Sequence, residues 1–271
     1  MTPINKLVRY RILSDAPTKH GQGTIWRAKD MLFDEEVALK EIQINLEDDP
    51  ILSLSILIEQ FWREARVGAR LGRLCPNIVK VSDYGQVDGV PYFAMEWIEG
   101  GNLVSQCGHV SLQKAKGMLR QICTAVRIAH QHGIVHSDIA PQNILYDKKA
   151  GFCKLADFGF LKVLDSILIS LGLGLAGGRQ HFMPPEHWLM PNKINKSTDI
   201  YALAHTLYAL VAGKLLEVSS EGKLKVPNVI QIRHESKIAP DEVRQLLNRF
   251  IEGRQEVDSI EDFLYFLDRI P

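Results

Sequence analysis

The chain has 271 residues, of which 46% are hydrophobic and 24% are charged. This balance is typical of a globular protein and excludes collagen-like, low-complexity and disordered chains. Lysine and arginine together number 32, as do aspartate and glutamate, so the formal net charge is zero. That charge gives no general argument for nucleic acid or an anionic membrane as a partner. The most apolar run covers about ten residues, 167–176, whereas a membrane span needs about 20. The four cysteines show no C-x-x-C spacing, which predicts reduced thiols in a cytoplasmic protein.

The first hundred residues are expected to be rich in strands. Alternating apolar residues and the turn residues between them predict strands at Tyr10–Ser14, Thr24–Ala28, Glu36–Gln43, Ile78–Ser82 and Tyr92–Trp97. One helix interrupts them, because helix-start residues at 48–50 precede apolar residues at helical spacing from Leu54 to Ala65.

The pattern changes to helices after Gly100-Gly101. Apolar residues from Leu112 to Ala129 recur in steps of three and four and predict an amphipathic helix. The stretch from Thr198 to Val211 is apolar almost all round and is expected at the centre of a lobe. Further helices are predicted at Pro240–Ile251 and Ser259–Ile270. The sequence therefore predicts two lobes, and clefts between lobes are where ligands usually bind.

One segment carries the strongest chemical signal. Ile134–Leu145 contains His136-Ser137-Asp138 and, five residues after the aspartate, Asn143; Asp157-Phe158-Gly159 follows. Taken alone, this pattern also fits a turn with a helix-capping asparagine. It resembles the catalytic loop and metal motif of the eukaryotic-type protein kinases. The resemblance implies that Asp138 orients a hydroxyl group and accepts its proton, and that Asn143 and Asp157 hold Mg²⁺.

Other segments resemble the same family in the same order. Val37-Ala38-Leu39-Lys40 resembles the strand whose lysine contacts the phosphates of ATP. Its partner should be a glutamate on the first helix, where Glu59 and Glu64 compete. Glu59 has surface ion-pair spacing to Arg63, whereas Glu64 shares the apolar helix face, so Glu64 is the predicted partner.

The remaining matches extend the resemblance over nearly the whole chain. Pro91–Gly101 resembles the hinge, with Met95 as gatekeeper and the backbone of Glu96 and Ile98 toward adenine. The end of the activation segment is matched by Pro184-Pro185-Glu186. The central helix of the family is matched by Ser197–Leu203, and the resemblance implies that its Asp199 anchors the catalytic loop. Arg254 is a weaker match to the late arginine that pairs with Glu186. The implied nucleotide-binding residues are Gly21, Gly23, Ile25, Ala38, Lys40, Met95, Glu96, Ile98 and Leu145.

The resemblance implies an α+β, bilobal protein-kinase-like fold in one domain, 1–271. Its N-lobe, about 8–99, would be a small antiparallel sheet with one main helix, and its C-lobe, about 100–271, mostly helical. The sequence of residues 199–208 most resembles that of the bacterial members of the family, which phosphorylate Ser and Thr.

Several positions depart from the family pattern. Thr18 and His20 replace glycines of the phosphate loop, and Ser137 replaces the arginine that pairs with a phosphorylated activation segment. Gly68, one turn after Glu64, replaces a bulky apolar residue. The catalytic-loop lysine is Ala140, and Arg179, where the family has a threonine, is the candidate catalytic cation in its place.

Three functions follow as alternatives. The first is ATP- and Mg²⁺-dependent phosphorylation of protein Ser/Thr hydroxyls, with no need for a phosphorylated activation segment. The second is a nucleotide-binding pseudokinase, and the third a small-molecule phosphotransferase of the aminoglycoside or choline type, which Pro185-Glu186 and the Asp199 helix disfavour. The apolar segment Leu161–Ala176 would pack on the protein or contact a partner.

Overall fold

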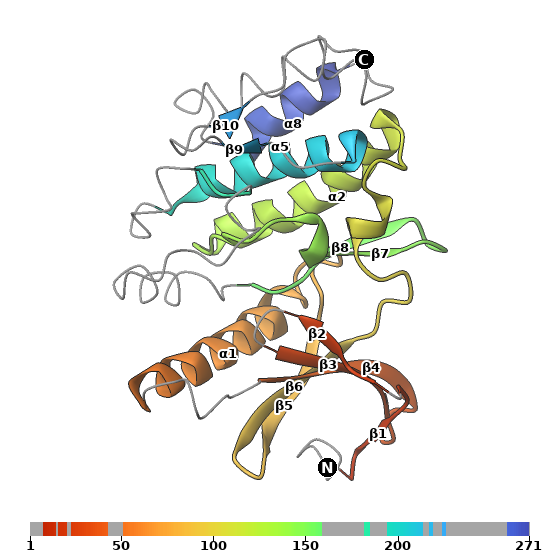
Figure 1. Cartoon of the computed structure of the whole chain (residues 1–271), viewed down its shortest axis with the longest axis vertical. Helices are drawn as coiled ribbons and strands as arrows, with labels where there is room; N and C mark the ends of the chain where they lie inside the picture. Colours follow the sequence, from red (N-terminus) through yellow and green to blue (C-terminus); the bar gives the residue numbers. More distant parts are fainter. Residues whose placement is uncertain are drawn as a thin grey trace. The chain divides into compact units, whose positions relative to one another are not determined.

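The computed structural model describes residues 8–14, 16–20, 23–42, 51–158, 182–184, 194–213, 217–218, 224–225 and 259–270. The chain divides into two compact units, Met1–Glu99 and Gly100–Pro271. The first unit holds the main sheet and one long helix, and the second holds helices α2, α5 and α8 (Figure 1). The predicted fold class, with a strand-rich first part and a helical second part, is confirmed.

An antiparallel sheet of six strands forms the first unit. Five strands run in the order β1-β3-β4-β6-β5, and β2 also pairs with β3. Helix α1 (Ile51–Leu71) packs against β5 and β6. The strands are β1 (Tyr10–Ile12), β2 (Thr18–His20), β3 (Gly23–Asp30), β4 (Glu35–Ile42), β5 (Val81–Val87) and β6 (Val90–Glu96).

Strand β5 is where the sequence prediction is wrong. The sequence predicts a strand at Ile78–Ser82, whereas β5 begins at Val81 and continues to Val87. Burial does alternate along β5, but its partly buried positions include Asp83 and Gly85. An acid and a glycine give no apolar alternation, so the sequence does not mark this half-buried strand.

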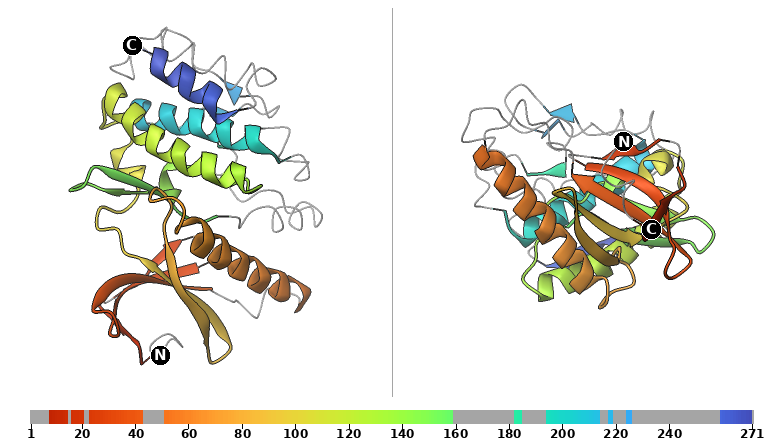
Figure 2. Two further views of the ribbon diagram at one scale, coloured as in Figure 1. Left: turned by 180° about the vertical axis from the view of Figure 1, so that it is seen from behind. Right: turned by 90° about the horizontal axis from the view of Figure 1, so that it is seen from below.

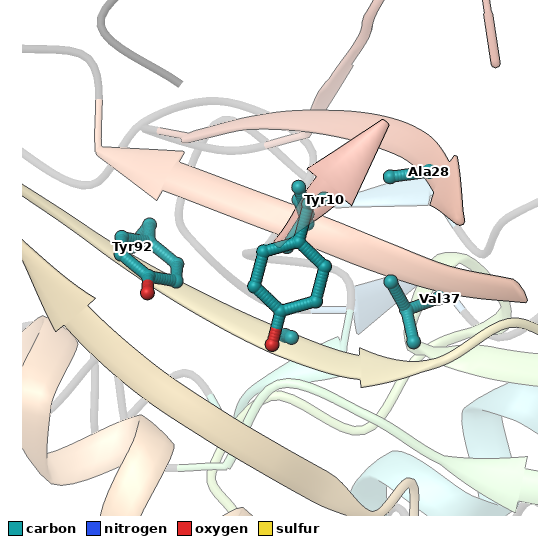
Figure 3. Close-up of a cluster of buried hydrophobic side chains, with 6 residues drawn as sticks. Tyr10, Ala28, Val37 and Tyr92 are labelled. Atoms are coloured by element: carbon teal, nitrogen blue, oxygen red, sulfur yellow. The ribbon is translucent and has the colours of Figure 1, made fainter. Parts of the chain in front are cut away.

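A buried cluster covers one face of the sheet (Figure 3). Its two tyrosine rings, Tyr10 and Tyr92, meet edge to face with centroids 6.2 Å apart. Successive side chains of a strand point to opposite faces, so Ala38 and Lys40 of β4 project from the other face of the sheet. The cluster consists of Tyr10, Ala28, Val37, Leu39, Tyr92 and Ala94.

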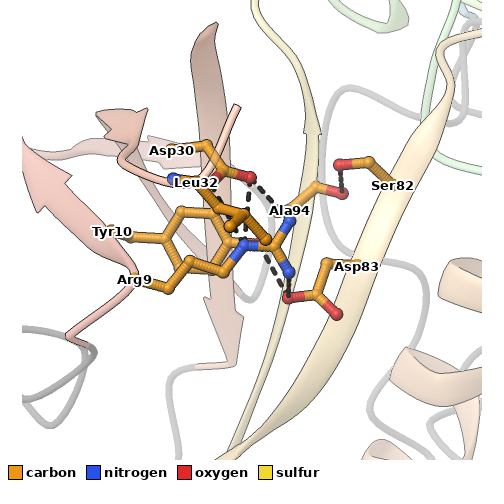
Figure 4. A network of polar contacts seen from close by, with 7 residues as sticks. All are labelled: Arg9, Tyr10, Asp30, Leu32, Ser82, Asp83 and Ala94. Atoms are coloured by element: carbon orange, nitrogen blue, oxygen red, sulfur yellow. Dashed lines mark hydrogen bonds and ion pairs between the residues drawn. The ribbon is translucent and has the colours of Figure 1, made fainter. Parts of the chain in front are cut away.

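The Arg9 guanidinium ties β1 to β3 and β5 (Figure 4). It lies 2.6 Å from Asp30 Oδ2 and 3.1 Å from Asp83 Oδ2, and the Tyr10 hydroxyl donates to the same Asp83 oxygen at 2.7 Å. The hydrogen bond from Arg9 lowers the pKa of Asp30, whereas burial, followed by the contact with Asp83, raises the pKa of Tyr10. The network therefore has a charged Asp30 and a neutral Tyr10 phenol near neutral pH.

Helix α1 approaches the start of β5 at two glycines. A Cβ at Gly68 would lie 2.7 Å from Val81 Cγ2, and a Cβ at Gly72 would lie 2.7 Å from Lys80 Cα. Real Cβ atoms do not make such short contacts, so glycine permits this packing distance. The departure from the family pattern at Gly68 thus has a steric reason in this sheet.

Helices dominate the second unit. Helix α2 (Leu112–Gln131) packs against α5 (Lys196–Ala212), α8 (Ile260–Arg269) and β8. Figure 1 and the left view of Figure 2 show α2 and α5 side by side from opposite directions. No helix within the described ranges is long and apolar enough to cross a membrane. The shorter elements are η2 (Leu103–Gln106), η3 (Pro141–Asn143), β7 (Ile144–Asp147), β8 (Phe152–Leu155), β9 (Glu217–Val218) and β10 (Leu224–Lys225).

Helix α5 is the buried centre of this unit, as the sequence predicts. Every residue from Thr198 to Val211 is buried. The Asn195 side chain accepts from Ser197 N, the Thr198 hydroxyl accepts from Asn195 N, and Gly213 ends the helix with φ of 75°. These caps satisfy groups at the two ends of the helix and fix where it begins and stops. The predicted helix at 240–251 lies outside the described residues.

The cysteines are free thiols. Cys75, Cys123 and Cys153 are buried, and burial raises the pKa of Cys153 to about 12. A thiol with such a pKa stays protonated near neutral pH and is a poor nucleophile. Cys153 therefore serves as a packing residue.

Two helical glycines give a matched test of the packing at α1. Gly117 in α2 has open space where a Cβ would stand, whereas Gly68 does not. Gly117→Ala should raise the free energy of unfolding by up to about 1 kcal/mol through helix propensity. Gly68→Ala gains the same propensity but overpacks, at a cost of about 1–3 kcal/mol, so urea unfolding should show it destabilised. Equal stabilisation by both substitutions would contradict the close approach at Gly68.

Candidate active site

A buried ion pair joins β4 to α1 in the first unit. Lys40 Nζ lies 2.7 Å from Glu64 Oε1, and both side chains are almost fully buried. Glu59, the competing glutamate, lies on the exposed side of α1 and pairs with Arg66 at 2.6 Å, not with Arg63. The structure therefore places Glu64 beside Lys40. Because removing one partner of a buried pair leaves an uncompensated charge, each residue depends on the other.

Four predicted nucleotide-binding residues lie on the sheet face that carries Lys40, and they are Gly23, Ile25, Ala38 and Met95. Ile25 is the cross-strand neighbour of Lys40, and Ala38 is that of Met95. Directly opposed residues of antiparallel strands project to the same face. A Cβ at Gly23 would lie 3.2 Å from Lys40 Cε, so glycine keeps space for the lysine stem. The sheet thus presents small and apolar side chains next to one ammonium group.

The other predicted adenine contacts are on separate elements. The Glu96 N–H donates to Lys80 O at 3.1 Å, and the Glu96 carboxylate accepts from Lys80 N at 2.8 Å. These two bonds fix the backbone where β6 ends. Ile98 follows half-buried, and Leu145 of the second unit is half-buried in β7, where it bridges to Asn102.

A fully buried carboxylate in the second unit holds the loop that contains His136, Ser137 and Asp138. Asp199 Oδ1 accepts from Ser137 N at 2.7 Å, and Asp199 Oδ2 accepts from His136 N at 2.9 Å. The His130 ring donates to the same Oδ2 from Nε2 at 2.7 Å. Ser137 has φ of 63°, a left-handed conformation that costs about 1–3 kcal/mol in a non-glycine residue. The hydrogen bonds of Asp199 stabilise the loop in this conformation.

The His136 ring forms hydrogen bonds with the backbone of two other residues, Asp138 and Ala156. Its Nδ1 accepts from Asp138 N at 3.2 Å, and its Nε2 lies 2.8 Å from Ala156 O. An accepting Nδ1 and a carbonyl opposite Nε2 require the neutral ring with its proton on Nε2. The ring also meets Phe158 edge to face at 4.6 Å between centroids. His136 therefore connects Asp138 to the backbone just before Asp157.

Asn143 completes the group. The side-chain Nδ2 of Asn143 donates to Asp138 O at 2.7 Å and to Asp138 Oδ2 at 2.8 Å. The backbone carbonyl of Asn143 accepts from Ala156 N at 2.9 Å. Among the described residues its buried Oδ1 has no hydrogen-bond partner. An amide whose nitrogen is bound and whose oxygen is buried and unpaired suits a cation.

The donor set fits Mg²⁺. The described residues contain no group of three or more His, Cys, Asp or Glu side chains that could hold a metal. Mg²⁺ prefers oxygen ligands and commonly takes only one or two from the protein, with phosphate and water supplying the rest. Asn143 Oδ1 and the half-exposed carboxylate of Asp157, whose φ is 60°, are such oxygens. When bound, Mg²⁺ neutralises charge on phosphate oxygens.

Some predicted residues lie outside the described part of the chain. These are Gly21, Arg179, Glu186 and Arg254, so their predicted roles stay predictions. Ala140 is fully buried and has no cationic group.

Sequence reasoning missed His130. It lies four residues after Val126 and so continues the buried stripe of α2, where the structure pairs it with Asp199. A histidine at the end of an apolar stripe was the available signal.

Comparison with known proteins decides the family. A family profile described as "Protein kinase domain" matches residues 20–262. The chain belongs to the protein kinase domain family. It is 34% identical over 198 residues to the serine/threonine-protein kinase PrkC of Bacillus subtilis, covering 72% of this chain and 29% of that protein. It is also 34% identical over 214 residues to PknA of Mycobacterium tuberculosis, covering 76% and 47%. The chain thus spans less than half the length of these relatives.

A solved kinase domain shows the same fold. The PknI kinase domain of Mycobacterium tuberculosis superposes with a TM-score of 0.70 at 22% sequence identity, over 96% of this chain and 95% of that one. The predicted kinase-like fold is therefore confirmed for this member of the kinase domain family.

The buried carboxylate of this kinase domain gives the next prediction. In Asp199→Asn the amide nitrogen replaces one accepting oxygen, so a backbone N–H of the loop must lose its acceptor. We expect the free energy of unfolding, measured in urea, to fall by about 1–3 kcal/mol. Asp268→Asn is the control, because its exposed pair with Arg120 contributes at most about 1 kcal/mol. An equal effect of both substitutions would show that Asp199 does not hold the loop.

Proposed function

We propose that the chain transfers the γ-phosphoryl group of ATP to Ser or Thr hydroxyls of protein substrates, with Mg²⁺ as cofactor. The observation that carries this proposal is the contact of Asn143 with Asp138, which leaves the Asn143 oxygen for a cation. The chain's relatives PrkC and PknA are described as serine/threonine-protein kinases, which supports the substrate class.

The residues divide the work as follows. Asp138 accepts the proton as the substrate oxygen forms its bond to phosphorus and the bond from phosphorus to the ADP oxygen breaks. Asn143 and Asp157 hold Mg²⁺, and Lys40, kept in place by Glu64, contacts the phosphates. The adenine contacts of the first unit are Ile25, Ala38, Met95 and the backbone of Glu96 and Ile98, and Leu145 is the residue that the family resemblance assigns to adenine in the second unit. Phosphoryl transfer needs little covalent help, so positioning and charge supply most of the rate.

The missing lysine leaves a place for a cation. Charge spreads over the γ-phosphoryl oxygens in the transition state, and a nearby cation stabilises it. Ala140 cannot supply one, and Arg179, whose guanidinium can bind a phosphate through two N–H groups, is our candidate for this role.

A nucleotide-binding pseudokinase is the second candidate. Thr18 and His20 in place of glycines and Ala140 in place of lysine favour it. Incubating the pure protein with Mg·ATP labelled on the γ-phosphate separates the candidates. Label on the protein itself or on protein substrates supports our proposal, whereas label on small alcohols, or on nothing, contradicts it.

The proposed base has its own test. Asp138→Asn should lower turnover by about 10²- to 10⁴-fold, the contribution of a positioned base, while ATP still binds. Asp147→Asn is the matched control, because within the described part of the chain Asp147 accepts only from the turn amides of Lys149 and Ala150. Turnover that survives Asp138→Asn would rule out the assignment.

The activation segment gives a second test. Ser137 offers no cation for a phosphate, and its hydroxyl donates to His136 O at 2.7 Å. Ser166 and Ser170 are the only hydroxyl residues between Asp157 and Glu186. The double variant Ser166→Ala with Ser170→Ala should therefore keep the wild-type turnover. A loss of activity that Ser166→Asp with Ser170→Asp restores would show that phosphorylation is required.

A further inference from the structure

Lys40 contacts an aromatic ring as well as Glu64. Phe93 of β6 is the cross-strand neighbour of Lys40, and Lys40 Nζ lies over the Phe93 ring, 5.6 Å from its centroid. This is within the distance at which the negative face of a ring attracts a cation. Both side chains are buried, and the attraction is strongest where water is excluded.

The same ring packs on the helix that carries Glu64. The Phe93 and Phe61 rings lie 4.9 Å apart between centroids, with their planes tilted by 42°. Phe61 is three residues before Glu64 in α1, so the two share a face of the helix. Phe93 therefore contacts the lysine directly and also contacts the helix that carries the lysine's glutamate partner.

A lysine ammonium needs such support because it is a point charge on a flexible four-carbon stem. The ion pair fixes the distance of the ammonium to Glu64. The ring face under the ammonium adds a contact that restricts the rotamers of the stem, and the contact of Phe93 with Phe61 restricts movement of α1.

We propose that Phe93 is a positioning residue for Lys40. The face of its ring holds the ammonium where the phosphates of ATP bind, and its packing on Phe61 keeps α1, with Glu64, beside the strand. This role rests on the function proposed above, since Lys40 has to meet phosphate for its position to matter. Phe93 is not among the residues assigned above to nucleotide binding, metal binding or proton transfer.

The test changes the charge distribution of the ring while keeping nearly its size. Phenylalanines carrying one, two and three fluorines are incorporated at position 93, since each fluorine weakens the negative ring face. In the nucleotide-free protein, an amine-reactive ester labels lysines, and mass spectrometry compares Lys40 with exposed Lys80. We expect Lys40 labelling to accelerate stepwise, by about 2- to 30-fold over the series, while Lys80 labelling and Tm stay constant. Turnover should fall in the same order.

Substitutions of Phe93 by standard amino acids give the two reference points for the fluorinated proteins. Phe93→Met keeps an apolar side chain of similar volume but removes the ring, so it should match the most fluorinated protein. Phe93→Tyr keeps the ring and should restore slow labelling. Tyr84→Met is the matched control, because Tyr84 lies 5.9 Å from Trp62 in the neighbouring aromatic contacts and is exposed. It should change neither rate.

The outcomes separate this inference from the proposed function. Lys40 labelling that is independent of fluorination, in a protein that transfers phosphate, overturns the role of Phe93 alone. Labelling that follows fluorination, in a protein that transfers no phosphate, overturns the proposed function while leaving the contact of ring and ammonium intact.

Discussion

The proposed catalytic loop depends on the buried carboxylate of Asp199. Asp199 is fully buried at the start of α5, and it accepts hydrogen bonds from His130, His136 and Ser137. Taking a carboxylate out of water costs several kcal/mol, so it is tolerated only where donors surround it. Two of these donors are backbone N–H groups of a loop strained at Ser137. The carboxylate thus stabilises a loop conformation that would otherwise relax, and the loop gives the carboxylate its partners.

A series of hydrogen bonds connects the residues bound by Asp199 to the proposed catalytic groups. His136 receives the Asp138 N–H and bonds to Ala156, and Asn143 bonds to both Asp138 and Ala156. Residues from two separate loops are therefore held by one set of bonds. The first unit uses the same principle with different groups, since the buried pair of Lys40 with Glu64 is stabilised by the elements that enclose it.

The sequence predicted the elements with a strong apolar pattern. The helix around Asp199, which is apolar almost all round, and the strand carrying Lys40 lie within one or two residues of the predicted bounds. It did not predict β2 at Thr18–His20, whose three residues are polar, or the extent of β5, where Asp83 and Gly85 interrupt the apolar alternation. It also did not assign His130, because the apolar stripe of α2 indicates only that this histidine is buried, and its partner Asp199 comes from the packing of α2 against α5. Motifs gave the candidate chemistry, while the bonds that position it come from tertiary structure.

Amide hydrogen exchange tests the central claim most directly. If Asp199 holds the loop, the amides of His136 and Ser137 should exchange as slowly as those in the interior of α5, although they lie in an irregular segment. The exposed turn amides of Lys149 and Ala150, which also bond to a carboxylate, supply the comparison and should exchange quickly. Exchange of His136 and Ser137 at the rate of these turn amides would contradict the account.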